Sequence, residues 1–99
     1  MEYTIRWKDM SKHPELETFF QEKIEKIRKF IFVEDFVKAE YVYYQHNKMY
    51  ELRINISIHK GNPIISEAKS LDPKTATVDC IEKAIDQLRK RKTQLHLTK

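Results

Sequence analysis

The sequence predicts an α+β fold, a two-layer sandwich in which both helices cover one face of a four-stranded mixed sheet in the order β-α-β-β-β-α. Two patterns support this class: apolar and polar residues alternate in short segments, and apolar residues recur every three or four positions in two longer ones. A chain of 99 residues and 12.0 kDa supplies one hydrophobic core, so we expect residues 1–99 to form a single domain.

The first strand and the first helix come from the N-terminal third. Alternation predicts a strand over residues 2–8. A helix is expected over residues 14–31, because Pro14 suits a first helical position, where an N–H is not needed. The apolar stripe of this helix consists of Leu16, Phe19, Phe20, Ile24, Ile27 and Phe30. On its outer face, the four-residue spacing predicts ion pairs between Glu22 and Lys26 and between Glu25 and Lys29.

Three more strands and a second helix follow. Residues 36–45 and 50–59 alternate and are separated by a turn, and Gly61 marks a hairpin turn before a fourth strand near residues 64–70. Asp72 and Pro73 suit the N-cap and first position of a helix over about 73–93. Its apolar stripe consists of Val78, Cys80, Ile81, Ala84, Ile85 and Leu88.

The order of the elements predicts the topology. A right-handed crossover through the first helix leaves the first two strands parallel, and the remaining strands form an antiparallel meander. Both helices need the same apolar sheet face. We expect the other face to be largely exposed to water and to carry Arg6, Lys8, Arg53 and His59.

The positive charge is concentrated near the C-terminus. Residues 1–80 contain 13 basic and 13 acidic side chains, whereas residues 81–99 contain six basic and two acidic ones, which accounts for the net charge of +4. The run Arg89-Lys90-Arg91-Lys92 begins a basic C-terminal tail from about residue 89. Such a run either complements the negative end of the helix dipole or attracts the phosphates of a nucleic acid.

The residues that support catalysis or metal binding lack a suitable arrangement. Cys80 lies in an apolar stripe, so we expect no nucleophile–base pair with any histidine, namely His13, His46, His59 or His96. The histidines lack the spacing of metal ligands, and one glycine is too few for a phosphate-binding loop. We therefore predict no enzyme activity, no catalytic or metal-binding residue and no cofactor.

The tyrosines of the second predicted strand divide between the two faces of the sheet. Tyr41 and Tyr43 are expected to pack on the apolar sheet face, whereas Tyr44 points to the opposite face and is better placed to stack on a base.

The composition indicates a soluble protein. The single cysteine forms no internal disulfide, and no apolar run approaches the roughly 20 residues of a membrane span. From these two observations we expect a cytoplasmic protein.

Both helices resemble those of the bacterial ribosome hibernation-promoting factor and ribosome-associated inhibitor A family, the sigma-54 modulation proteins. In the first helix, the resemblance rests on Pro14-Glu15-Leu16, Phe19-Phe20, Lys23-Ile24, Lys26-Ile27 and Lys29-Phe30. In the second, it rests on Ile81-Glu82-Lys83, Gln87-Leu88-Arg89-Lys90 and Lys92. The chain departs from the family pattern where Pro73-Lys74 replaces the usual Met-Tyr. It resembles a short form, without the extra C-terminal domain of long members or the acidic tail of the inhibitor type.

The resemblance implies a ribosome hibernation factor of stationary phase and stress. Such a protein binds the small ribosomal subunit between head and body, where it occludes the mRNA channel and the A and P tRNA sites. The partners are ribosomal RNA and neighbouring ribosomal proteins, with no membrane or small-molecule substrate, and we expect a free monomer. The expected RNA-binding residues are Lys83, Arg89, Lys90, Arg91, Lys92, Lys23, Lys26 and Lys29, with Arg6 and Lys8 as a second tier. The alternatives are a double-stranded RNA-binding module, a protein-interaction adaptor and a small enzyme or ligand-binding protein.

Overall fold

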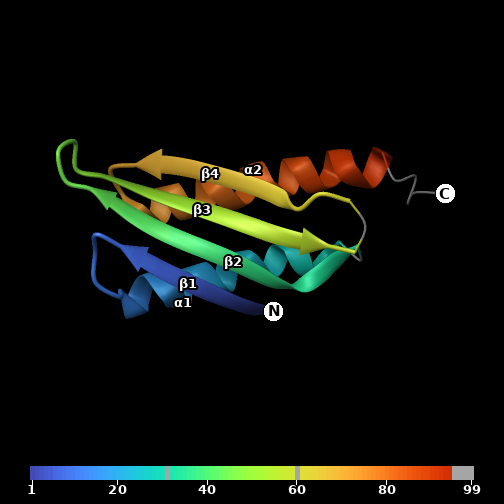
Figure 1. The fold of residues 1–99 in the computed structure, drawn as a ribbon, viewed down its shortest axis with the longest axis horizontal. Helices are drawn as coiled ribbons and strands as arrows, with labels where there is room; N and C mark the ends of the chain where they lie inside the picture. The colour runs from blue at the N-terminus through green and yellow to red at the C-terminus, as the bar shows by residue number, and fades with distance from the viewer. Residues whose placement is uncertain (31, 60, 95–99) are drawn as a thin grey trace.

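A mixed sheet forms one layer of the molecule, and two helices form the other (Figure 1). The computed structural model describes residues 1–30, 32–59 and 61–94. The strands are β1 (Glu2–Lys8), β2 (Val33–Tyr44), β3 (Met49–Ile58) and β4 (Ile64–Ser70), and they lie side by side in the order β1-β2-β3-β4. β1 is parallel to β2, and the other pairs are antiparallel. The predicted topology is therefore confirmed.

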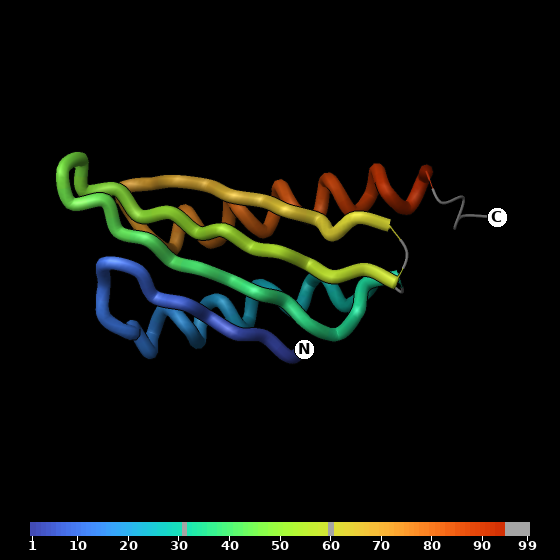
Figure 2. The backbone as a smooth tube through the Cα atoms, viewed as in Figure 1, coloured from blue at the N-terminus to red at the C-terminus, as the bar shows by residue number. Residues whose placement is uncertain are grey.

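Both helices lie on the same side of the sheet, as predicted. They are α1 (Pro14–Ile24), which continues as the 3-10 helix η1 (Glu25–Lys29), and α2 (Pro73–Gln94). Figure 2 shows the two helical segments running side by side behind the strands, with the C-terminal end of α2 at the opposite end from the β2–β3 hairpin. The core between the layers includes the fully buried side chains of Phe20, Ile27, Tyr41 and Leu88.

The first helix is shorter than the range 14–31 that the apolar spacing predicts. α1 ends at Ile24, and residues 25–29 form the tighter η1, while residue 31 lies outside the described residues. A 3-10 turn brings residues three apart into contact. Glu25 accordingly pairs with Arg28 at 3.1 Å, and also with the N-terminal ammonium of Met1 at 3.1 Å. Neither predicted pair, Glu22–Lys26 or Glu25–Lys29, occurs among the ion pairs of the described residues.

Local contacts explain where the helices and turns begin. The Nδ1 atom of His13 accepts a hydrogen bond from the backbone N–H of Leu16 at 3.1 Å, which caps α1. The predicted cap of α2 is confirmed, because the carboxylate of Asp72 accepts from the backbone N–H of Lys74 at 3.4 Å and from the hydroxyl of Thr75 at 3.0 Å. Gly61 has a φ of +98°, which suits glycine in the turn before β4.

Two buried polar contacts fix α2 on the sheet. The hydroxyls of Tyr41 in β2 and Thr77 in α2 share a hydrogen bond of 2.6 Å. The hydroxyl of Ser66 in β4 donates to the backbone carbonyl of Cys80 in α2 at 2.8 Å. These contacts join α2 to β2 and β4 on the side of the helix that its apolar stripe buries.

The face of the sheet opposite the helices, here called the sheet face, is less exposed than the sequence predicts. Val42 and Glu51 both point to this face, yet they are only 3% and 2% exposed. They are cross-strand partners in the middle two strands, where long neighbouring side chains cover them. The expectation of a face largely exposed to water therefore does not hold at the centre of the sheet.

Candidate RNA-binding surface

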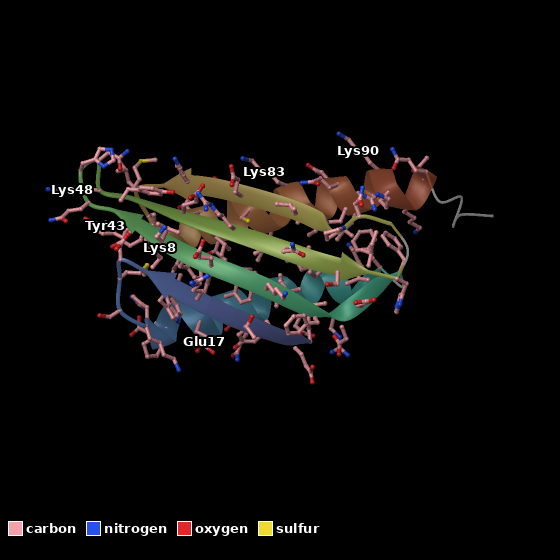
Figure 3. The ribbon with its side chains drawn as sticks, viewed as in Figure 1. Lys8, Glu17, Tyr43, Lys48, Lys83 and Lys90 are labelled. Atoms are coloured by element: carbon pink, nitrogen blue, oxygen red, sulfur yellow. The ribbon has the colours of Figure 1, made fainter. Side chains whose placement is uncertain are left out.

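The predicted cations of the C-terminal run all lie on α2. The apolar stripe of this helix, from Cys80 to Leu88, is buried against the sheet, which leaves its charged residues on the outside. Arg89, Lys90 and Lys92 are exposed, and Figure 3 shows Lys83 and Lys90 along the same edge of the molecule. The run thus forms an exposed basic surface over the last turns of α2.

Three α2 side chains, spaced four residues apart, donate hydrogen bonds to the backbone of the adjacent edge strand and the turn before it. Lys83 Nζ donates to the carbonyl of Glu67 at 3.3 Å, Gln87 Nε2 to that of Ile65 at 2.8 Å, and the Arg91 guanidinium to that of Asn62 at 2.9 Å. These bonds satisfy carbonyls at the exposed edge of the sheet. Lys83 and Arg91 therefore have a structural role, although an ammonium and a guanidinium each keep further donors.

The other cations of the run differ in how far protein carboxylates neutralise them. Arg89 pairs with Asp86 at 3.7 Å, and both side chains are mostly exposed. Lys90 and Lys92 have no ion pair among the described residues. The two lysines are thus the best placed of the run to bind an external phosphate.

The predicted lysines of the first helical segment lie beside aromatic rings or in solvent. Lys23 Nζ lies 5.2 Å from the ring centroid of Phe19, Lys29 Nζ lies 5.6 Å from that of Phe30, and Lys26 is exposed. Lys74 Nζ in α2 lies 5.6 Å from the same Phe19 centroid, although the sequence did not predict Lys74 as a site residue. Its approach to α1 depends on how the two helices pack, and no sequence pattern carries that information.

Two cations of the sheet face, Arg6 and Arg53, are paired with carboxylates, whereas Lys8, Lys38 and Lys69 have no ion pair among the described residues. A cross-strand row runs from Arg6 in β1 through Glu40 and Arg53 to Glu67 in β4. Arg6 lies 3.9 Å from Glu40, and Arg53 lies 3.7 Å from Glu40 and 3.5 Å from Glu67. Alternating charges of this kind offer little net attraction to RNA, so Arg6 is a weaker candidate than the lysines of the helices.

Glu51 is the centre of this charge network. Its carboxylate lies 3.1 Å from the Arg53 guanidinium and accepts a hydrogen bond from the Tyr44 hydroxyl at 2.6 Å. This hydrogen bond raises the pKa of Tyr44, and the negative charge of Glu51 raises the pKa of Arg53. Lys69 Nζ lies 4.7 Å from the Tyr44 ring centroid. Tyr44 is therefore half-buried in the network and does not present an open ring for stacking. Lys8, which belongs to the same face, is exposed at the end of β1.

The buried cysteine does not form a nucleophilic site. Cys80 is fully buried, and its thiol contacts the backbone carbonyl of Ser66 at 3.5 Å. Burial raises the pKa of the Cys80 thiol to about 11, so it stays protonated at neutral pH.

In the described ranges, no three histidine, cysteine or acidic residues are grouped so that they could hold a metal ion. Within the same ranges, no helix is both long and apolar enough to span a bilayer.

Comparison with known proteins identifies the family. Residues 3–96 match the family described as sigma 54 modulation protein / S30EA ribosomal protein. The chain belongs to this family. The match confirms the resemblance found in the two helices, and it extends over nearly the whole sequence. No curated protein matches the chain.

Solved structures share the fold of this family member at low sequence identity. A ribosomal subunit interface protein from Coxiella burnetii is 17% identical, with a TM-score of 0.82, and the match covers 94% of this chain and 99% of that one. The N-terminal domain of Protein Y from Thermus thermophilus is 12% identical, with a TM-score of 0.79, and the match covers 91% and 98% of the two chains. The predicted α+β class and element order are thus confirmed.

Proposed function

We propose that this protein is a cytoplasmic ribosome hibernation factor, which binds the small ribosomal subunit between head and body. There it occludes the mRNA channel and the A and P tRNA sites, and translation stops because the space is occupied, with no covalent step. Membership of the family supports a ribosomal partner. Ribosomal RNA and neighbouring ribosomal proteins form the binding site, and residues 1–99 act as one domain and one monomer.

The observation that carries this proposal is the exposed basic run at the end of α2, where Lys90 and Lys92 have no ion pair among the described residues. On the sheet face, by contrast, carboxylates lie among the cations. Arg6 and Arg53 lie beside these carboxylates. Among the described residues of the helical layer, Lys90, Lys92 and Lys23 have no such partner. Phosphates bind where cations are clustered and not already neutralised, and the run at residues 89–92 is such a cluster, so we expect the helical layer to face the RNA.

Cosedimentation with separated ribosomal subunits across a salt series tests the proposal. We expect near-stoichiometric binding to the small subunit, which weakens as salt rises because counterions are released from RNA. The double variant Lys90→Ala/Lys92→Ala is expected to lower the slope of log K against log salt by about 1.4 to 1.8. The matched control Lys38→Ala/Lys69→Ala removes the same charge from the sheet face and is expected to leave the slope nearly unchanged.

Two results would contradict the proposal. The first is wild-type protein that stays at the top of the gradient even at low salt. The second is binding to naked double-stranded RNA that is as tight as binding to the small subunit, which would favour a double-stranded RNA-binding module. Equal losses in the two double variants would overturn only the assignment of the helical layer as the RNA-binding side.

A further inference from the structure

One aromatic ring at the junction of the two helices carries two lysines from different helices. Phe19 lies in α1 and is half-buried. Its ring centroid is 5.2 Å from Nζ of Lys23 in α1 and 5.6 Å from Nζ of Lys74 in the first turn of α2. These three residues are here called the Phe19 cluster. The ring attracts both ammonium groups, so one aromatic side chain positions a lysine from each of the two helices.

The Phe19 cluster contains no carboxylate to balance these charges. Neither Lys23 nor Lys74 takes part in an ion pair within the described part of the chain. Asp72 is close in sequence, but its carboxylate already accepts from the backbone N–H of Lys74 and the hydroxyl of Thr75. The first turn of α2 contains no other acidic residue.

On the sheet face, Lys69 and Tyr44 form a similar pair of a lysine over an aromatic ring, but with a carboxylate close by. Lys69 Nζ lies 4.7 Å from the ring centroid of Tyr44, as the Phe19 lysines lie over their ring. The Tyr44 hydroxyl, however, donates to the carboxylate of Glu51, so negative charge is present beside that lysine. The two sites share a lysine over an aromatic ring and differ in counter-charge.

We propose that Lys23 and Lys74 bind one segment of RNA backbone together, as a phosphate clamp held in place by Phe19. This inference rests on the proposed function and assigns a contact at the α1–α2 junction, far along the helix from the basic run at residues 89–92. The phosphates of the backbone supply the negative charge that both ammonium groups lack, and they meet side chains whose freedom the ring has already reduced. The ring orders the lysines, and it does not need to stack on a base.

Single substitutions measured against small ribosomal subunits test the clamp. Lys23→Ala and Lys74→Ala are each expected to weaken binding by about four- to sixfold at about 0.15 M salt and to lower the salt slope by about 0.7 to 0.9. Phe19→Leu keeps both charges, so we expect weaker binding with an unchanged slope. Lys69→Ala is the matched control and is expected to stay within about twofold of wild type. Thermal melting verifies that each variant is folded.

The outcomes separate the clamp from the proposed function. If Lys23→Ala and Lys74→Ala behave like Lys69→Ala while Lys90→Ala/Lys92→Ala weakens binding, the clamp is overturned and ribosome binding stands. If the wild-type protein does not bind ribosomes, the proposed function fails, and a short single-stranded RNA then serves as the probe in an NMR titration. Shifts of the Lys23 and Lys74 side-chain signals larger than that of Lys69 support the clamp, and equal or absent shifts overturn it.

Discussion

Replacing Arg53 tests the sheet-face network most directly. Arg53 is about half exposed, whereas its partner Glu51 is 2% exposed. Arg53→Met keeps the apolar stem and removes the charge, which leaves the Glu51 carboxylate with the Tyr44 hydroxyl as its remaining side-chain partner. Breaking a fully buried pair costs about 3–5 kcal/mol. Because water reaches Arg53 and the Tyr44 hydrogen bond remains, we expect a loss of about 2 kcal/mol in the free energy of unfolding.

Replacing Glu51 as well tests whether the loss in Arg53→Met comes from an unpaired buried carboxylate. Glu51→Gln keeps an acceptor for the Tyr44 hydroxyl and leaves no unpaired buried charge. We therefore expect it to lower the free energy of unfolding by only about 1 kcal/mol. In the double variant Arg53→Met/Glu51→Gln, no buried carboxylate is left unpaired. The double variant is therefore expected to be more stable than Arg53→Met alone, with a coupling energy of about 1–2 kcal/mol.

Urea unfolding followed by the fluorescence of Trp7 measures these free energies. The indole stacks on the buried Tyr41 ring, with 5.1 Å between the centroids, so its emission reports on the core. A loss of about 2 kcal/mol corresponds to a fall of about 8–16 °C in the melting temperature of a domain this size. The reasoning fails if Arg53→Met lies within about 0.5 kcal/mol of wild type, or if the double variant is less stable than Arg53→Met.

Three further predictions concern the cysteine, a helix cap and a turn. Burial raises the pKa of the Cys80 thiol from 9.0 to about 11, so the folded state keeps a proton that the unfolded chain releases. The Cys80 contribution to stability is thus expected to fall by about 1.4 kcal/mol per pH unit between about pH 9 and about pH 11. Urea unfolding at several pH values should show that Cys80→Ala loses this component; parallel profiles would count against it. His13→Ala removes the cap of α1 and is expected to cost about 1 kcal/mol in thermal melts, whereas His13→Asn restores a cap; equal losses in the two variants would exclude a capping role. Gly61→Ala places a Cβ at a φ of +98° and 3.3 Å from the Arg91 guanidinium, so we expect a loss of about 1–2 kcal/mol, against no more than about 0.5 kcal/mol for the control Asn62→Ala.

The fold was predictable because its patterns are local. Alternation placed β1 at residues 2–8, the turn at Gly61 placed β4 near residues 64–70, and the structure has these bounds. The change from α-helix to 3-10 helix at Glu25 was not predictable in this way, because Ile27 and Phe30 suit either helix when judged by apolar spacing alone. In the 3-10 turn Glu25 pairs with Arg28 and with the N-terminal ammonium of Met1, and the latter group comes from a distant part of the chain.

The candidate site was predictable only in part, for a related reason. The exposure of Lys90 and Lys92 follows from the helical period of α2, which the sequence contains. The meeting of Lys74 with Phe19 joins residues 55 positions apart and depends on how two helices pack. The burial of Glu51 likewise depends on which side chains of neighbouring strands cover it, although alternation assigned it to the correct face.

Charge composition alone therefore does not say which side of this protein meets RNA. The sheet face carries five cations, which by number alone would form a basic patch: Arg6, Lys8, Lys38, Arg53 and Lys69. Cross-strand register places Glu40, Glu51 and Glu67 among them, and each carboxylate competes directly with an incoming phosphate. Lys69 and the two Phe19 lysines therefore differ in their expected affinity for anions, although all three lie over aromatic rings. Among the described residues, a carboxylate is hydrogen-bonded to the ring side chain only in the case of Lys69, where the Tyr44 hydroxyl donates to Glu51. If that reasoning holds, neutralising Glu51 should raise the affinity of the sheet face for RNA, while the affinity of the helical layer stays unchanged.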